Sequence, residues 1–275
     1  MLVGYLGPKG SFSHQVAQKA FPKADLIPYQ TITEVIKAYE NRLVDFSIVP
    51  VENSIEGSVH ETLDYLFHHA QLQTVVELIQ PIKQQLMVSN FGNPIEKIFS
   101  HPQALAQSKV YIQKHYPDAM LEMTASTASA ARLVAEHPDK PYAAIAPESA
   151  AFEYDLQIVA RDVQEMSENF TRFWVLGIEM PILFLESLGF KQTLALTLPD
   201  NLPGALYKAL SVFAWRGIDL TKIESRPLKT ALGEYFFILD VDGRQEKLLQ
   251  FALEELATIG ITFKILGHYQ VYLIE

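Results

Sequence analysis

Residues 1–160 repeat one pattern, in which a short apolar run is followed by a polar loop and then by a helix. The first repeat has a strand over 2–6, a glycine-containing loop over 7–14 and a helix whose apolar positions Val16 and Ala20 lie one turn apart. Later strands are expected at 26–29, 46–51, 98–100, 121–124 and 142–145. Because strands that alternate with helices favour parallel pairing, the pattern predicts an α/β fold.

The repeats form two lobes. Lobe 1 is expected to cover about residues 1–80 plus 165–180, and lobe 2 about residues 81–164, because the strand-like stretch 75–88 contains a proline and indicates a crossover. The chain then returns to lobe 1 at 163–176. We therefore expect the lobes to enclose a hinged cleft, as in periplasmic solute-binding proteins.

The pattern changes after Gly177. An apolar, proline-containing connector over 178–190 leads into elements with the order β-α-β-β-α-β. Helices are expected at 202–215 and 248–259, and strands at 192–199, 218–226, 233–242 and 261–274. This order is ferredoxin-like. The sequence thus predicts two domains, one over residues 1–180 and one over residues 190–275.

Composition and charge exclude several classes of function. The 275 residues carry a formal net charge of −10 and contain no block rich in lysine or arginine, which argues against nucleic-acid binding. The absence of cysteine excludes disulfides, thiolate metal sites and a cysteine nucleophile. The first residues lack a basic signal-peptide region, and no apolar run approaches the roughly 18 residues of a membrane span. We therefore expect a cytoplasmic protein that does not bind a membrane.

Polar side chains gather where the predicted strands end. Residues 52–58 follow one strand, and residues 101–103 follow another. Ligands of open α/β sheets bind at the carboxyl ends of strands, so these clusters are candidates for one site. Helix capping explains the same side chains equally well, because Ser and Thr are preferred N-cap residues.

The stretch 168–173 places a hydroxyl, an amide and a guanidinium directly before an apolar run. Thr171 and Arg172 are expected in a loop or at the first residues of a strand, anchored by a buried segment. Arginine can hold a carboxylate with two parallel hydrogen bonds. A surface Thr–Arg pair at a strand start is the alternative.

Neither a metal site nor a serine hydrolase site is predicted. His60, His68 and His69 share one helical stretch, but no acidic or thiolate pattern accompanies them. No Gly-x-Ser-x-Gly motif follows a predicted strand.

Taken in order, the motifs resemble those of monofunctional bacterial prephenate dehydratases with a C-terminal ACT regulatory domain. The resemblance covers nearly the whole chain. Its motifs are Gly7-Pro-Lys-Gly-Ser-Phe-Ser-His14, Val49-Pro-Val-Glu-Asn-Ser-Ile-Glu-Gly-Ser58, Ser100-His-Pro-Gln-Ala104, Ser126-Thr127, Ala143-Ala-Ile-Ala146, Asn169-Phe-Thr-Arg-Phe173, Gly204-Ala-Leu206 and Glu224-Ser-Arg-Pro227. It implies a two-lobed catalytic domain like a periplasmic binding protein, followed by a ferredoxin-like βαββαβ ACT domain.

The resemblance also implies the chemistry. The family removes water and CO2 from prephenate to give phenylpyruvate in L-phenylalanine biosynthesis, a lyase reaction that needs no metal and no redox cofactor. Thr171 is expected to bind or protonate the leaving hydroxyl and Arg172 to position a substrate carboxylate. Glu52 or Glu56 would supply the proton if burial raises its pKa. Nothing upstream of Met1 leaves room for a chorismate mutase domain, so that activity is not expected.

Further residues are assigned by the same resemblance. Residues expected to bind the substrate are Ser11, Asn53, Ser54, Ser58, Gln103, Ser126, Thr127, Asn169 and Phe173. Residues expected to bind phenylalanine between two paired ACT domains are Gly204, Ala205, Leu206, Glu224, Ser225, Arg226 and Pro227. The protein would then be a homodimer or homotetramer, in which feedback inhibition requires that phenylalanine bind two states with different affinity.

Two alternative functions remain open at this point. Arogenate dehydratase acts on a substrate with an amino group in place of the keto group, and the sequence does not separate the two activities. A non-catalytic amino-acid sensor would combine a solute-binding fold with an ACT module, but it would not need the threonine of residues 169–173. Turnover of prephenate distinguishes an enzyme from a sensor.

Overall fold

The computed structural model describes residues 1–92, 94–198, 203–228 and 235–274, which form a mixed α/β fold. It divides into two compact units. Unit 1 comprises residues 1–59, 79–173 and 274–275, and unit 2 comprises residues 60–78 and 174–273. Neither unit is continuous in sequence, because strands β5 (Gln73–Pro81) and β11 (Phe170–Gly177) both cross the boundary. The division into domains at 178–190 stays a prediction.

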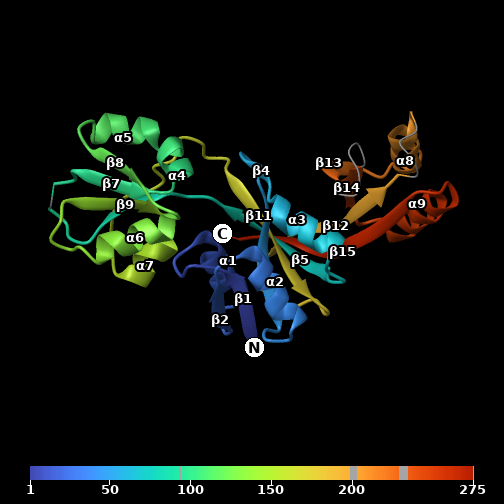
Figure 1. Cartoon of the computed structure of the whole chain (residues 1–275), viewed down its shortest axis with the longest axis horizontal. Coiled ribbons are helices and arrows are strands. Elements are labelled where there is room, and N and C mark those ends of the chain that lie inside the picture. The colour runs from blue at the N-terminus through green and yellow to red at the C-terminus, as the bar shows by residue number, and fades with distance from the viewer. Residues whose placement is uncertain (93, 199–202, 229–234, 275) are drawn as a thin grey trace. The chain divides into compact units, whose positions relative to one another are not determined.

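Lobe 1 of unit 1 contains a parallel group of strands in the order β2-β1-β3 (Figure 1). The elements are β1 (Leu2–Leu6), α1 (Phe12–Ala20), β2 (Asp25–Tyr29), α2 (Ile32–Glu40) and β3 (Phe46–Asn53). Both β2 and β3 pair with β1 in parallel, as the alternation of strands and helices predicts. The short strand β4 (Gly57–Ser58) folds back on the end of β3, with Gly57 opposite Asn53.

Lobe 2 of unit 1 has a sheet in the order β10-β6-β9-β7-β8. Its strands are β6 (Gln85–Val88), β7 (Lys97–Ser100), β8 (Met120–Met123), β9 (Tyr142–Ala146) and β10 (Gln157–Ala160). Parallel pairing holds for β7 with β8 and β9, whereas β6 is antiparallel to both β9 and β10. The chain enters β6 from β5, which belongs to the other sheet, so β6 is not part of the run of strand–helix units that pair in parallel.

Helices cover both faces of the lobe 2 sheet (Figure 1). They are α4 (Pro102–Gln107), α5 (Lys109–His115), α6 (Thr127–Ala135) and α7 (Glu148–Tyr154). Met87 and Ala144 pack with α6 and α7, while their neighbours Leu86 and Ala143 pack with α4 and α5. Successive strand residues point to opposite faces, so these strands must be apolar throughout.

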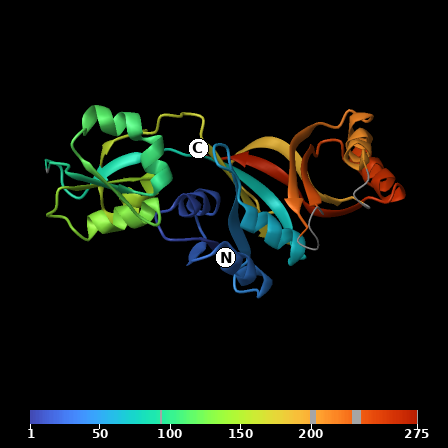
Figure 2. The ribbon, with the colours of Figure 1, turned by 45° about the horizontal axis from the view of Figure 1, so that its top comes forward.

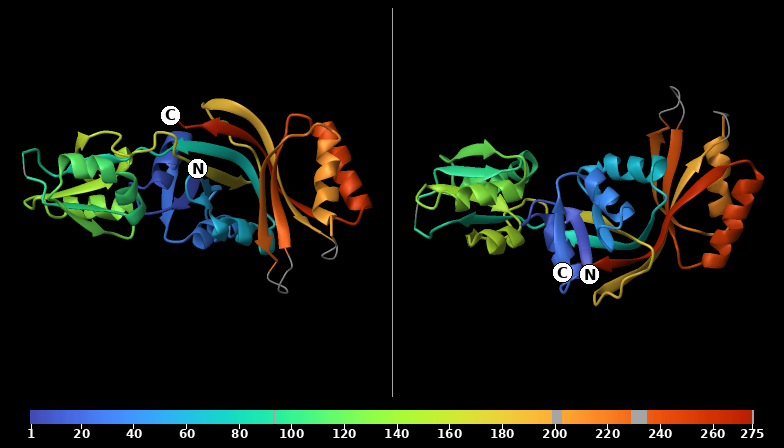
Figure 3. Two further views of the ribbon diagram at one scale, coloured as in Figure 1. Left: turned by 90° about the horizontal axis from the view of Figure 1, so that it is seen from above. Right: turned by 60° about the horizontal axis from the view of Figure 1, so that its bottom comes forward.

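Unit 2 contains an antiparallel group of strands with two helices on one face, visible in Figures 2 and 3. The elements are α3 (His60–His68), β12 (Glu186–Thr197), α8 (Ala205–Ala214), β13 (Leu220–Pro227), β14 (Tyr235–Asp242), α9 (Glu246–Thr258) and β15 (Thr262–Leu273). The strand order β13-β14-β12-β15 continues to β5. Leu196 of β12, Phe213 of α8 and Leu256 of α9 share one core. The first two residues of the predicted strand 233–242 lie outside the described residues.

The helices are short. The longest one described, α9, has 13 residues. Within the described part of the chain, no helix is long and apolar enough to cross a membrane.

Candidate active site

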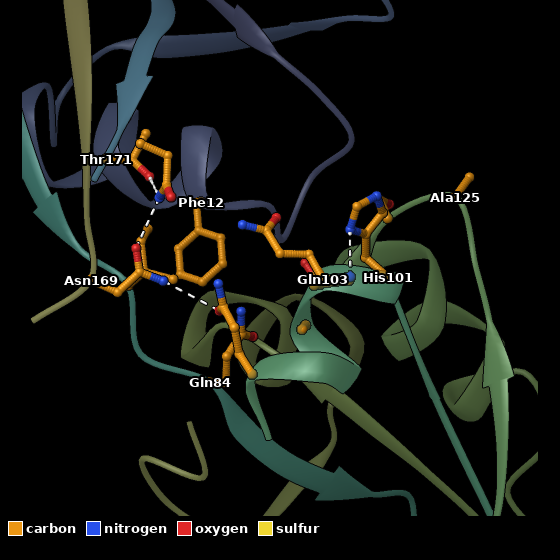
Figure 4. A pocket seen from close by; sticks show the side chains of 13 residues that line it. Phe12, Gln84, His101, Gln103, Ala125, Asn169 and Thr171 are labelled. Carbon is orange, nitrogen blue, oxygen red and sulfur yellow. Dashed lines mark hydrogen bonds between the residues drawn. The ribbon is translucent and has the colours of Figure 1, made fainter. Parts of the chain in front are cut away.

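Unit 1 contains a cavity of about 280 Å³ (Figure 4). Lobe 1 contributes Phe12 and Asn53, and the returning strand β11 with the residue before it contributes Thr171 and Asn169. The remaining lining residues precede or belong to lobe 2 and are Ile82, Gln84, His101, Gln103, Ala104, Gln107, Ala125, Ser126 and Thr127. Six residues predicted from the sequence to bind or convert substrate therefore line one cavity: Asn53, Gln103, Ser126, Thr127, Asn169 and Thr171.

The turn after β3 fixes the orientation of the Asn53 amide. The side-chain oxygen of Asn53 accepts hydrogen bonds from the backbone N–H groups of Ile55, at 3.0 Å, and Glu56, at 3.2 Å. This is the local geometry in which asparagine stabilises a turn. Because the oxygen is held by the backbone, the NH2 group of Asn53 must face β11.

The NH2 group of Asn53 donates to the hydroxyl of Thr171. The distance from Asn53 Nδ2 to Thr171 Oγ1 is 2.9 Å, and Asn53 also donates to the side-chain oxygen of Asn169 at 2.9 Å. A threonine hydroxyl has one donor and two acceptor positions. Since Thr171 accepts from Asn53, its own O–H can donate into the cavity.

The hydrogen bonds between side-chain amides continue from Asn53 through Asn169 to Gln107 of lobe 2. Asn169 is 1% exposed, and its Nδ2 donates to Oε1 of Gln107 at 3.3 Å. Two buried lining atoms, Gln107 Nε2 and Gln84 Oε1, have no hydrogen-bond partner among the described residues. A buried polar atom left unpaired costs roughly 1–3 kcal/mol, so a polar ligand that pairs with these two atoms gains affinity.

Two helix starts form the lobe 2 side of the cavity. His101 precedes α4, and its Nδ1 accepts from the backbone N–H of Gln103 at 3.4 Å. Ser126 precedes α6, and its Oγ accepts from the backbone N–H of Ser129 at 3.0 Å. Ser126 therefore caps α6 and also lines the cavity.

Glu52 and Arg172 form an ion pair beside the cavity. Arg172 Nη1 donates to Glu52 Oε2 at 2.5 Å, and the side chains are 15% and 25% exposed respectively. Neither residue lines the cavity. Neighbouring strand residues point to opposite faces, so if Asn53 and Thr171 face the cavity, Glu52 and Arg172 face away.

Four other predicted substrate-binding residues do not line the cavity. Ser11 caps α1 by accepting from the backbone N–H of His14 at 3.2 Å. Ser54 accepts from the backbone N–H of Phe170 at 3.0 Å. Ser58 lies in β4, and Phe173 is 2% exposed in the core.

Seven lining residues were not among the predicted site residues: Phe12, Ile82, Gln84, His101, Ala104, Gln107 and Ala125. Phe12 and His101 lie inside motifs that the sequence presents. Gln107 lies four residues after Gln103 on the same helix, a spacing that places both on one face. Nothing in the local sequence marks Gln84.

The residues predicted to bind phenylalanine lie in unit 2. Gly204 precedes α8 with φ 81°, a conformation that favours glycine, and Ala205 and Leu206 form the first turn. In β13, Arg226 donates to both carboxylate oxygens of Asp64 on α3, at 3.1 and 3.2 Å. Glu224 lies 3.6 Å from a ring nitrogen of His60 on the same helix.

No group of three or more His, Cys, Asp or Glu side chains in the described ranges could hold a metal ion. His60, His68 and His69 on and beside α3 do not form such a group with described residues.

Comparison with known proteins assigns the chain to a family. The family model described as prephenate dehydratase matches residues 3–181. The chain belongs to the prephenate dehydratase family. The prephenate dehydratase of Lactococcus lactis subsp. cremoris is 51% identical over 274 residues, which cover 99% of this chain and 98% of the relative. That of Bacillus subtilis is 41% identical over 283 residues and covers 99% of both chains.

A solved structure of prephenate dehydratase agrees with this assignment. The Arthrobacter aurescens protein in complex with L-Phe is 32% identical, with a TM-score of 0.85 over 98% of this chain and 90% of that one. The reaction expected from the sequence is confirmed: prephenate loses water and CO2 to give phenylpyruvate, a lyase step of phenylalanine biosynthesis. The alternative of a non-catalytic sensor is thereby set aside.

Proposed function

We propose that prephenate is converted in the cavity of unit 1 and that Thr171 donates a hydrogen bond to the hydroxyl that leaves. The observation that carries this proposal is the hydrogen bond from Asn53 Nδ2 to Thr171 Oγ1, which uses an acceptor position of the hydroxyl and leaves its O–H able to donate to a ligand in the cavity. Charge develops on the departing oxygen as the C–O bond breaks. A donor already oriented toward that oxygen stabilises the transition state more than the ground state.

The amides and the apolar side chains have separate roles in this proposal. Asn53 and Asn169 hold Thr171 in place, and Gln84 and Gln107 pair with polar groups of the substrate through their buried free atoms. Phe12 contributes an apolar surface to the cavity. One carboxylate leaves as CO2 while the ring becomes aromatic, and the departing hydroxide takes up one proton to become water.

We propose a structural role for Glu52 and Arg172 in addition to the roles predicted from the sequence. A threonine hydroxyl is too weak an acid to supply the proton alone, and Glu52 as its source stays a prediction. The 2.5 Å ion pair supports a different contribution, in which Glu52 and Arg172 hold β3 beside β11 so that Asn53 and Thr171 stay in register. Removing one partner of a partly buried ion pair lowers stability.

Two variants of Thr171 test the active-site proposal. Thr171→Val keeps the shape of the side chain but removes the hydroxyl, and we expect kcat for phenylpyruvate formation to fall by about 100- to 1,000-fold, as for loss of one oriented donor. Thr171→Ser keeps the hydroxyl and should stay within about tenfold of the wild type. Wild-type kcat in Thr171→Val would overturn the proposal. Running the assay with prephenate and arogenate also establishes substrate preference.

We further propose that unit 2 contains an ACT regulatory domain and that the lobes of unit 1 are arranged like those of periplasmic binding proteins. The order β12-α8-β13-β14-α9-β15 supports the first assignment, since it is βαββαβ. Phenylalanine is the proposed effector, acting in a homodimer or homotetramer, and the L-Phe complex of the Arthrobacter aurescens relative supports this choice. Inhibition by phenylalanine together with a raised melting temperature tests it.

A further inference from the structure

The lining of the cavity contains one ionisable side chain among the described residues. That residue is His101, and the other twelve lining residues are apolar, amide or hydroxyl side chains. Prephenate carries two carboxylates. Taking a carboxylate out of water is costly unless donors replace its hydration, and no Lys or Arg is present among the described lining residues to do so.

The hydrogen bond at Nδ1 of His101 determines which ring nitrogen can donate. Its Nδ1 accepts from the backbone N–H of Gln103 at 3.4 Å, which favours the tautomer with hydrogen on Nε2. His101 lines the cavity and also caps α4, so Nε2–H is the donor that its ring has left for a ligand. A hydrogen bond from such a donor to a charged acceptor is stronger than one between neutral groups.

His101 and Thr171 lie toward opposite ends of the cavity, with Phe12 between them in Figure 4. In prephenate the leaving hydroxyl is at one end of the ring, and both carboxyl-bearing substituents are at the other. If Thr171 binds the hydroxyl, His101 therefore faces the carboxylate end. Gln103, Ser126 and Thr127 line the cavity from the same lobe as His101.

We infer that His101 Nε2–H binds the carboxylate of the pyruvyl side chain, which the product retains. A donor on the ring carboxylate would stabilise a charge that disappears as CO2 forms, and so would slow the reaction. A donor on the pyruvyl carboxylate binds ground state and transition state alike, which lowers KM and leaves kcat unchanged. His101 is thus assigned as a substrate-binding residue, and the assignment rests on the proposed active site.

The test uses two replacements of His101 that differ in reach. His101→Asn keeps a good N-cap for α4 but is too short to place a donor at the position of Nε2, whereas His101→Gln can place its amide N–H there. We expect His101→Asn to raise KM for prephenate by about 10- to 100-fold, the effect of losing a hydrogen bond to a charged group, with kcat within about threefold. His101→Gln should recover most of the loss. His101→Ser, a short cap as well, repeats the measurement if His101→Asn does not fold.

Inhibition by phenylpyruvate identifies which carboxylate His101 binds. This product keeps the pyruvyl carboxylate but has neither the ring carboxylate nor the hydroxyl, so its inhibition constant should rise in His101→Asn in parallel with KM. An unchanged inhibition constant, or a lower kcat with unchanged KM, would overturn the inference. Thr171→Val serves as the matched control, because it should lower kcat and leave phenylpyruvate inhibition unchanged. Full activity of Thr171→Val would instead overturn the active-site proposal.

Discussion

Asn53 shows how one side chain can carry both structure and chemistry. Its oxygen closes the turn after β3, and its NH2 group reaches Thr171 and Asn169. A side-chain amide accepts through its oxygen and donates through its NH2 group. Replacement by aspartate separates these functions, because a carboxylate still accepts from the turn but cannot donate to Thr171.

We expect Asn53→Asp to lower kcat by roughly 100-fold and also to lower the melting temperature, because the new carboxylate would face the side-chain oxygen of Asn169 and the backbone carbonyl of Phe170. The Thr171 hydroxyl would donate to the new carboxylate instead of the substrate, and the donor that stabilises the transition state would be lost. Steady-state kinetics and thermal unfolding measure the two effects. A variant with wild-type kcat would show that the orientation of Thr171 does not depend on Asn53.

His14 provides a prediction about pH. Burial lowers the pKa of His14 below the ordinary value of about 6.5, with Glu153 opposing this shift and Lys9 reinforcing it. The ring accepts from the backbone N–H of Gly10 at 2.9 Å and stacks on Tyr5. Because the unfolded chain takes up the proton first as pH falls, acidification below about 6.5 favours unfolding.

His14→Gln removes this titration and keeps a hydrogen-bond acceptor. We expect the variant to lose less free energy of unfolding between pH 7 and pH 5 than the wild type, as measured by urea titration at each pH. Equal losses in the two proteins would mean that other groups account for the acid sensitivity.

At the level of elements, the end of α3 is held by a side chain from a distant strand. Lys264 of β15 donates to the backbone carbonyls of Leu66 at 2.6 Å, Phe67 at 3.0 Å and Ala70 at 2.5 Å. The last carbonyls of a helix have no partner within the helix, and a cation there also complements the helix dipole. Burial partly desolvates the ammonium and so lowers the pKa of Lys264.

We expect Lys264→Met to lower the free energy of unfolding by about 1–3 kcal/mol, because buried carbonyls lose their donor while the aliphatic packing is kept. Lys247→Met on α9 is the matched control, since Lys247 is exposed, and a change within about 0.5 kcal/mol is expected there. Urea unfolding of both variants makes the comparison. Equal changes in the two variants would show that the three hydrogen bonds of Lys264 do not contribute measurably to the free energy of unfolding.

Sequence patterns predict several elements and only part of the site. The alternation of strands and helices predicts the parallel pairing of β1, β2 and β3, and Thr31 and Glu34 form a capping box at the start of α2. The pairing of β6 depends on long-range contacts that its four residues do not encode.

Local sequence also does not determine which side chains face the cavity. A strand alternates, so a sequence pattern shows that Thr171 and Arg172 face opposite sides but not which one faces the cavity. Gln84 reaches the cavity only because the lobes come together in three dimensions.

At the level of the whole molecule, α3 links the proposed effector region to the active site along the chain. It begins two residues after β4, which pairs with the Glu52–Asn53 end of β3. Its Asp64 binds Arg226, a residue proposed to contact phenylalanine. An effector that rearranges Arg226 would therefore act directly on the helix that follows Asn53.

Asp64→Asn tests this link. We expect basal activity to stay near the wild-type value while the phenylalanine concentration needed for half-maximal inhibition changes by at least fivefold, within the range typical of coupling energies. Asp242→Asn is the control, because the carboxylate of Asp242 pairs with Arg244 in the same unit. Calorimetry measures the affinity for phenylalanine directly, and so distinguishes weaker binding of phenylalanine from a weaker effect of bound phenylalanine on activity. An unchanged inhibition curve in Asp64→Asn would contradict the link.

The interleaving of the two units along the chain limits how genes of this family can recombine. Phe67 of α3 stacks on Phe236 of β14 with ring centroids 3.7 Å apart, although 168 residues of sequence separate them. Ile274, near the C-terminus, donates back to the carbonyl of Ile79 in unit 1 at 2.8 Å. A crossover between two genes near residue 180 would join an α3 from one parent to a β14 from the other. In such a chimaera the contacting residues of α3 and β14 come from different parents and need not fit each other. We therefore expect α3 and the C-terminal strands to evolve together, even though a whole lobe is encoded between them.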